Sequence, residues 1–180
     1  MLENLFCLGL VGAAIALIFA LIQAKKVLGF SEGNELMQKL AASIRKGANA
    51  YLKRQYTTVA KIFIIVFVIL LLLAWQGMLD NWFIPFAFLT GGIYSGLAGF
   101  IGMKIATSAN ARTANAAHES LNRGLNVAFS SGAVMGFTVV GLGLLDVSIW
   151  FHILKYIAHF DAAKICLLYT SDAADDLTRV

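Results

Sequence analysis

The run IFIIVFVILLLLAW, from Ile62 to Trp75, carries no charged side chain and lies in a charge-free interval between Lys61 and Asp80. A helix that crosses a hydrocarbon core of about 30 Å needs about 20 largely apolar residues, because each residue adds about 1.5 Å of rise. Unpaired backbone groups are costly in lipid, and the run lacks the alternation of a barrel strand. The sequence therefore predicts a transmembrane helix here.

Three further intervals are free of formal charge: Glu3 to Lys25, Asp80 to Lys104, and Arg123 to Asp146. Of the 180 residues, 59% are hydrophobic and only 13% are charged, which is unlike the composition of a soluble domain. We expect an all-α polytopic membrane protein with about four transmembrane helices. Glu3 stands where a signal peptide would carry Lys or Arg, so we interpret the first span as a retained anchor.

Basic residues are divided unevenly among the connections between these spans. Eight of them fall in the segment 25–61 and three at or between positions 104 and 123, whereas the second connection consists of Asp80 and Asn81. By the positive-inside rule, connections 25–61 and 104–123 are expected to be cytoplasmic, with the N-terminus outside. In a bacterium this would be the inner (plasma) membrane. Orientation explains the net charge of +4, so we expect the lipid bilayer as a partner and no nucleic acid.

The first connection has helical periodicity of its own. Apolar or uncharged residues recur three and four positions apart, while lysines occupy other positions. This stripe consists of Leu36, Leu40, Ile44, Ala48, Tyr51 and Gln55. We expect a cytoplasmic amphipathic helix, capped near Ser31, that continues into the second span. It would serve either as a solvated cover over the cytoplasmic mouth or as a basic lever or lipid-facing anchor.

Small residues recur four apart in the third and fourth spans, a spacing that lets helix backbones approach closely. They are Gly92 and Gly96, Ser95 and Gly99, Ala98 and Gly102, and the series Ala128, Gly132 and Gly136. Pro85 falls in the first turn of its span and predicts no kink. The segment 147–157 either extends the fourth helix or lies along the interface, which Trp150 and Tyr156 would suit.

We identify no catalytic, cofactor-binding or metal-ligating residue. Divalent cations need several hard oxygen ligands at once, and zinc needs grouped His or Cys side chains. The candidates are instead scattered: Glu32, Glu35, Glu119, Asp80, Asp146, His118, His152, His159, Cys7 and Cys166. No charged residue is expected in the middle of a span, where it would indicate function.

Several longer motifs occur in order along the chain. They are IRKGANAYLKRQY (44–56), AFLTGG (87–92), GFIGMKIATSANARTANAA (99–117), FSSGAVMG (129–136) and VGLGLL (140–145). Together they resemble the membrane-bound, cation-pumping inorganic pyrophosphatases, over about residues 5–158. Several long motifs in the right order are far more specific than one short pattern.

The resemblance implies an enzyme that hydrolyses pyrophosphate, held by magnesium ions in a cytoplasmic funnel, and moves protons or sodium ions across the membrane as a homodimer. Magnesium is thus the implied cofactor, and dependence on potassium is left open. The four spans resemble outer-ring helices that brace an inner ring. The aspartate-rich motifs of that family lie on later helices, so we expect this chain alone to be an inactive fragment.

We divide the chain into residues 1–165, the N-terminal part of a truncated pyrophosphatase domain, and residues 166–180, which resemble a translated sequencing-library adapter and are expected to be non-native. The alternative is a small non-catalytic membrane scaffold or partner protein. A natural stop codon near residue 165 would favour that alternative, and a downstream frame with closely spaced aspartates would favour the pump. A secondary carrier would need a polar site at the midplane or a broken helix, and the sequence offers neither.

Overall fold

The structure is a computed structural model that describes residues 2–79 and 82–156. This part of the chain forms α1 (Leu2–Leu28), α2 (Glu35–Trp75), α3 (Ile84–Glu119) and α4 (Leu121–Tyr156). All four helices are long and apolar enough to cross a membrane. The predicted all-α polytopic architecture is confirmed.

Some predictions concern residues that the structure does not describe. They are the Asp80–Asn81 connection, His159, Cys166 and the tail 166–180. The side chain of Cys7 is likewise not described. These predictions stand as they were made.

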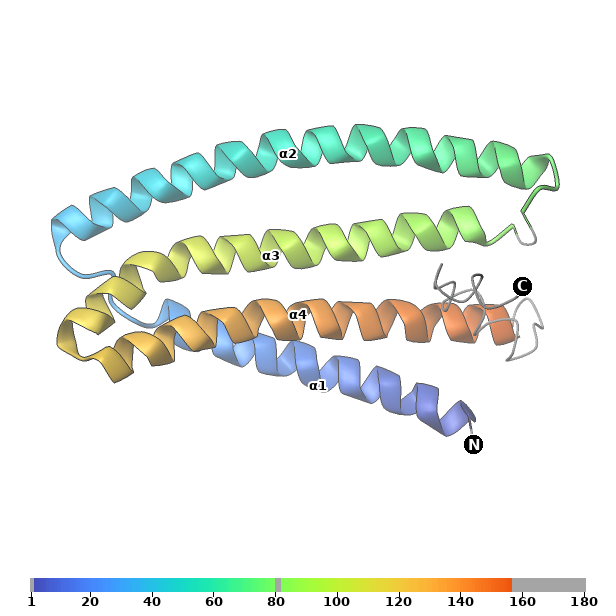
Figure 1. Cartoon of the computed structure of the whole chain (residues 1–180). Helices are drawn as coiled ribbons and strands as arrows, with labels where there is room; N and C mark the ends of the chain where they lie inside the picture. Colours follow the sequence, from blue (N-terminus) through green and yellow to red (C-terminus); the bar gives the residue numbers. More distant parts are fainter. Residues whose placement is uncertain (1, 80–81, 157–180) are drawn as a thin grey trace, which may run out of the picture.

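The helices follow one another in space in the order α2, α3, α4, α1, and neighbours along the chain run in opposite directions (Figure 1). α4 packs against both α3 and α1, whereas α2 packs only against α3 among the described helices. The loop 29–34 and the turn around Ser120 lie together at one end, here called the basic end. The N-terminus and the α2–α3 connection lie at the opposite end, so the two basic connections share one end as the charge pattern predicts.

α2 is one continuous helix of 41 residues, as the periodicity predicted. At about 1.5 Å per residue it is about 62 Å long, roughly twice the thickness of a hydrocarbon core. Asn34 caps it by accepting a hydrogen bond from the Met37 amide at 2.9 Å. The predicted cap at Ser31 is wrong, because the Ser31 hydroxyl instead accepts from the amide of Gly33 at 3.1 Å, within a turn where Gly33 has φ +87°.

The face of α2 that packs against α3 differs from the predicted apolar stripe. Its buried residues are Ala41, Leu52 and Ala74, while Leu36 is 66% exposed and Ile44 46% exposed. Leu40 and Tyr51 of the predicted stripe each precede a buried residue, Ala41 or Leu52, by one position. The stripe therefore faces a different side of α2 from the one that packs on α3. Apolar periodicity identifies a face that avoids water, but small residues such as Ala41 decide where two helices approach most closely.

Aromatic side chains of α2 lie in the gaps left by glycines of α3. A β-carbon added at Gly92 would overlap the Phe63 ring, which stacks on Phe88 with ring centroids 4.8 Å apart. The Tyr56 hydroxyl donates to the Gly96 carbonyl at 2.7 Å. The predicted packing role of the small residues in the third span is confirmed.

The contacts of α4 use Gly102, which was among the predicted small residues of the third span, and Gly141, which was not. A β-carbon at Gly102 of α3 would lie 2.7 Å from Met135 Cγ, and one at Gly141 of α4 would lie 2.9 Å from Leu17 Cγ of α1. By contrast, a β-carbon at Gly132 or Gly136 would meet nothing within 4 Å in the described structure. The two glycines of the series predicted for the fourth span thus receive no side chain from the described residues, and the packing role of the series stays a prediction for the intact protein.

The helix α4 continues past Asp146 to Tyr156, so the segment after Asp146 extends the fourth helix. Trp150 is only 6% exposed, and its Nε1 donates to Thr90 Oγ1 at 2.6 Å. Trp150 is thus packed inside the bundle, with its indole N–H bound to a partner on α3. Its level relative to the membrane interface stays a prediction. Pro85 lies buried in the first turn of α3, as predicted.

Replacing Gly92 with Ala should destabilise the bundle by about 1–3 kcal/mol, the usual range for overpacking, because the new methyl group would overlap the Phe63 ring. Gly132→Ala is the matched control, since its methyl group would project into open space within this chain. Thermal unfolding of both variants in the same detergent measures the difference. Equal midpoints for the two variants would contradict the interlocking of α2 with α3.

Candidate functional site

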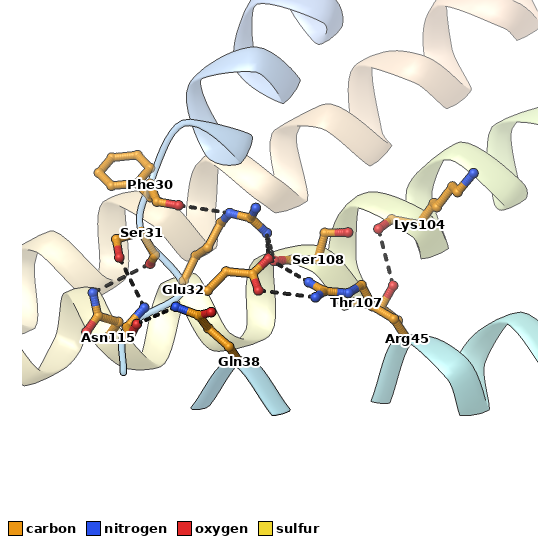
Figure 2. Close-up of polar contacts among 11 residues, drawn as sticks. Phe30, Ser31, Glu32, Gln38, Arg45, Lys104, Thr107, Ser108 and Asn115 are labelled. Atoms are coloured by element: carbon orange, nitrogen blue, oxygen red, sulfur yellow. Dashed lines mark hydrogen bonds and ion pairs between the residues drawn. The ribbon is translucent and has the colours of Figure 1, made fainter. Parts of the chain in front are cut away.

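The most connected group of polar side chains lies at the basic end, around Glu32. Its carboxylate accepts hydrogen bonds from both terminal nitrogens of Arg45, at 2.6 and 3.1 Å (Figure 2). Arg112 of α3 forms a second ion pair with Glu32 Oε1 at 2.9 Å. One carboxylate in the loop 29–34 therefore joins α2 to α3. We call these three residues the Glu32 cluster.

Further hydrogen bonds fix the loop beside this cluster. Arg112 Nε donates to the Phe30 carbonyl at 3.0 Å, and Asn115 Nδ2 to the Ser31 carbonyl at 3.5 Å. Gln38 Nε2 donates to the Gly33 carbonyl at 3.0 Å. The backbone of the α1–α2 loop is thus held from α3 and from the first turn of α2 (Figure 2).

The Glu32 side chain is 18% exposed and that of Arg112 is 13% exposed. The hydrogen bond from Arg45 is the largest cause that holds the pKa of the Glu32 carboxyl below its usual range. Partial burial raises this pKa, and the positive charges of Arg112 and Arg45 lower it. Glu32 is therefore ionised at neutral pH. Its charge is balanced locally, which lowers the cost of partial burial.

The Glu32 cluster is suited to holding helices together. Two guanidinium groups bind the Glu32 carboxylate, and that of Arg112 also donates to a backbone carbonyl. A divalent cation prefers several carboxylate oxygens that are free to bind it, and the Glu32 cluster does not provide them. A cavity of about 300 Å³ next to it is lined by loop residues 29–31 together with Asn115, Glu119 and Arg123. Glu119 and Arg123 form an ion pair one turn apart.

Asp146 was among the scattered candidates of the sequence interpretation, which did not indicate its surroundings. It was placed near a helix end, but α4 continues ten residues beyond it, and its Oδ1 is buried without a hydrogen-bond partner in the described structure. A cavity of about 320 Å³ between α3 and α4 contains it together with Tyr94 and Ser95. The predicted position of Asp146 near a helix end is therefore wrong, because α4 continues beyond it. The expectation that no charged residue lies in the middle of a span stays a prediction. The apolar spacing of Val147, Trp150 and Leu154 was the signal that the helix continues.

The other residues considered for chemistry do not gather into a site. Within residues 2–79 and 82–156, no three His, Cys, Asp or Glu side chains lie close enough to hold a metal ion. His118 ends α3 at the basic end, whereas His152 lies near the end of α4, with its Nδ1 2.8 Å from the Ser148 carbonyl. That no catalytic residue occurs in this chain stays a prediction.

The comparison with protein families settles the relationship that the motifs suggest. A family model described as inorganic H+ pyrophosphatase matches residues 14–172, most of the chain. The chain belongs to this family. The matched region contains three of the four helices completely and the second half of α1.

Individual pyrophosphatase relatives agree with the family match. The chain is 48% identical over 171 residues to a putative K(+)-stimulated pyrophosphate-energized sodium pump of Bacteroides thetaiotaomicron. The aligned region covers 93% of this chain and 23% of the relative. It is 40% identical over 147 residues to a K(+)-insensitive pyrophosphate-energized proton pump of Methanosarcina mazei, covering 82% of this chain and 21% of the relative. A K(+)-insensitive proton pump of Moorella thermoacetica is 45% identical over 141 residues, with 78% and 20% covered. The chain thus spans about a fifth to a quarter of these pyrophosphatase relatives.

Glu32→Gln should lower the stability of the bundle by about 1–2 kcal/mol near neutral pH, because two arginines lose a charged hydrogen-bond acceptor. A lowered pKa in the folded state means that the carboxylate stabilises fully above the unfolded pKa and loses this effect as the pH falls through the folded pKa. The deficit of the variant should therefore shrink in acid. Glu35→Gln, on an exposed residue in the first turn of α2, is the control. A deficit that is the same at acid and neutral pH would contradict this role of the Glu32 charge.

Proposed function

We propose that this chain is the N-terminal part of a pump that couples pyrophosphate hydrolysis to the transport of protons or sodium ions. The observation that carries the proposal is the family match over residues 14–172, supported by 48% identity to a relative named as a pyrophosphate-energized sodium pump. Relatives named as proton pumps match over much of the same chain. We therefore keep both ions in the proposal.

In this proposal the four helices form a supporting wall, and hydrolysis takes place elsewhere in the polypeptide. Magnesium pyrophosphate requires several carboxylate oxygens, and the described residues bring no such group together. The residues present here therefore do not fit a magnesium site. Potassium, which the names of some relatives include as a stimulating ion, would likewise be bound outside this wall.

The exposed face of α4 supports a role as part of a larger helical assembly. Ala128, Gly132 and Gly136 lie on one exposed side of the helix, and a β-carbon at either glycine would meet nothing within 4 Å. Small residues on a transmembrane helix allow close backbone contact with another helix. We propose that a helix from the remainder of the pump packs on this face.

We further propose that the basic end faces the cytoplasm of a bacterial cell and that the assembled pump is a homodimer in the inner membrane. The support for orientation is that the basic residues gather in segments 25–61 and 104–123, whose loop 29–34 and turn around Ser120 lie at the same end of the bundle. Trp75 and Trp82 are exposed near the opposite end, where they would lie at the second lipid interface. The homodimer rests on the family resemblance.

The alternative is a small non-catalytic scaffold built from the same helices. It would share the fold and the Glu32 cluster, and it differs in lacking a downstream catalytic part. Residues 166–180 remain a proposed non-native tail, although the family match enters this segment as far as residue 172. Sequencing genomic DNA across and beyond residue 165 distinguishes a continuing pump gene from a natural stop codon.

Membranes that contain this chain alone should release no more phosphate from magnesium pyrophosphate than membranes without it. The positive control is the whole Moorella thermoacetica relative, expressed and assayed in the same way. Phosphate release above background by the 180-residue chain would overturn the assignment of hydrolysis to other parts of the pump.

Cysteine labelling tests the proposed orientation. Lys46→Cys and Met78→Cys place thiols on exposed positions toward the basic end and at the opposite end, respectively, in a background where Cys7 and Cys166 are replaced by Ser. A membrane-impermeant maleimide added to intact bacterial spheroplasts should label position 78 and spare position 46. Labelling at both positions, or at position 46 alone, would contradict the orientation.

A further inference from the structure

An apolar groove of about 420 Å³ lies between α2 and α3. Its walls include large side chains that are partly exposed: Val59 and Ile64 on α2, and Leu89, Ile93, Leu97 and Phe100 on α3. Ile64 is 61% exposed and Ile93 is 54% exposed. Because α2 packs on no described helix other than α3, no further helix within residues 2–79 and 82–156 lies over the groove.

The groove lies at the depth of the membrane. Counting about 20 residues from Ile84 along α3 reaches Met103, and counting the same number back from Trp75 along α2 reaches Tyr56. This count on α2 includes Lys61, the last basic residue of the segment 25–61, whose exposed side chain is long enough to carry its ammonium toward the headgroups at the basic end. The groove residues of α3, from Leu89 to Phe100, extend over about 16 Å at 1.5 Å per residue and fall within the counted span of α3. We therefore expect acyl chains, and not water, along its walls.

Two lysines lie on α2 and α3 about one helical turn beyond the groove residues, toward the basic end. Tyr56 and Phe100 lie level with each other, with ring centroids 6.2 Å apart. Lys53 lies one helical turn beyond Tyr56, and Lys104 one turn beyond Phe100, so the antiparallel helices bring both lysines to the same level. Lys104 Nζ lies 5.1 Å from the centroid of the Phe100 ring, which lines the groove.

We propose that this groove is a binding site for an anionic phospholipid, with one acyl chain along the apolar walls and the headgroup phosphate against Lys53 and Lys104. Lipid headgroups begin at the level where the span ends, and this is the level of the two lysines. A cation near the membrane surface attracts anionic lipid, and a lysine stem can lie along apolar surface while its ammonium reaches the phosphate.

The groove fits an acyl chain better than a further helix. Close helix contact requires small residues, and the small residues of α3 along this groove already receive the aromatic side chains of α2, since Gly92 faces Phe63 and Gly96 faces Tyr56. The walls that remain open are branched or aromatic side chains. A flexible acyl chain adapts to such walls, and no polar partner is required, because the Tyr56 hydroxyl is already bound to the Gly96 carbonyl.

Photo-crosslinking identifies the occupant. The chain, with p-benzoylphenylalanine in place of Ile93, is inserted into vesicles of equal parts phosphatidylglycerol and phosphatidylcholine, irradiated and analysed by mass spectrometry. Ile18 on α1, an isoleucine of similar exposure at 58%, takes the same label as the control. We expect phosphatidylglycerol adducts to be enriched over phosphatidylcholine adducts at position 93 relative to position 18.

Charge variants test the headgroup contact. Lys53→Gln and Lys104→Gln should each lower the enrichment at position 93 about fivefold, equivalent to about 1 kcal/mol for one cation near an anionic surface. Replacing both lysines with Arg should preserve the enrichment. Lys25→Gln is the matched control, an exposed lysine toward the same end but on α1, and should leave the ratio unchanged.

Three results would overturn the proposal. They are an adduct ratio at position 93 equal to that at position 18, a ratio that neither Lys53→Gln nor Lys104→Gln changes, and cross-links from position 93 to peptide of a second copy in place of lipid. All substituted lysines are exposed, so the variants should retain the helical bundle, which circular dichroism verifies. The proposal does not depend on pyrophosphate hydrolysis, so it can fail or succeed separately from the proposed function.

Discussion

The absence of water from the hydrocarbon core constrains every other feature of this chain. Each backbone amide and carbonyl within the membrane must find a partner inside its own segment, and a helix provides it. The charge-free intervals between Lys61 and Asp80 and between Asp80 and Lys104 therefore become parts of long continuous helices, α2 and α3. Once the backbone is satisfied in this way, side chains alone decide how the helices are arranged.

Two kinds of side-chain contact determine how the helices are arranged. In the membrane, lipid is as apolar as leucine, so close packing replaces the hydrophobic effect, and Gly92, Gly102 and Gly141 provide the space for Phe63, Met135 and Leu17. At the basic end, ion pairs determine the arrangement, because Glu32 binds Arg45 and Arg112 and so fixes the α1–α2 loop against α3. Neither contact alone would define the arrangement, because one sets helix spacing and the other sets the position of a loop.

The membrane architecture could be predicted because it depends on local composition. Charge-free length indicates a span, and basic residues indicate which connections share a side, as the shared end of the loop 29–34 and the turn around Ser120 shows. The motifs likewise indicated the family, since the order of several long motifs is a property of the sequence itself.

What could not be predicted depends on neighbours distant in sequence. The Glu32 cluster joins a loop to Arg112, and nothing in the local pattern around either residue indicates that contact. The face of α2 that packs on α3 could not be predicted, because the sequence shows apolar periodicity without showing where α3 lies. The residue type of Trp150 suits a membrane interface, but it does not indicate that the indole donates to Thr90 on another helix.

The small-residue face of α4 has a consequence for how the membrane protein is made. In the proposed pump, this face would contact lipid until the later helix packs on it. Ala128, Gly132 and Gly136 present little side-chain surface, so the later helix could approach the backbone of α4 closely. The same small residues would allow close approach by any other helix, so the order in which helices enter the bilayer would decide which one this face meets first.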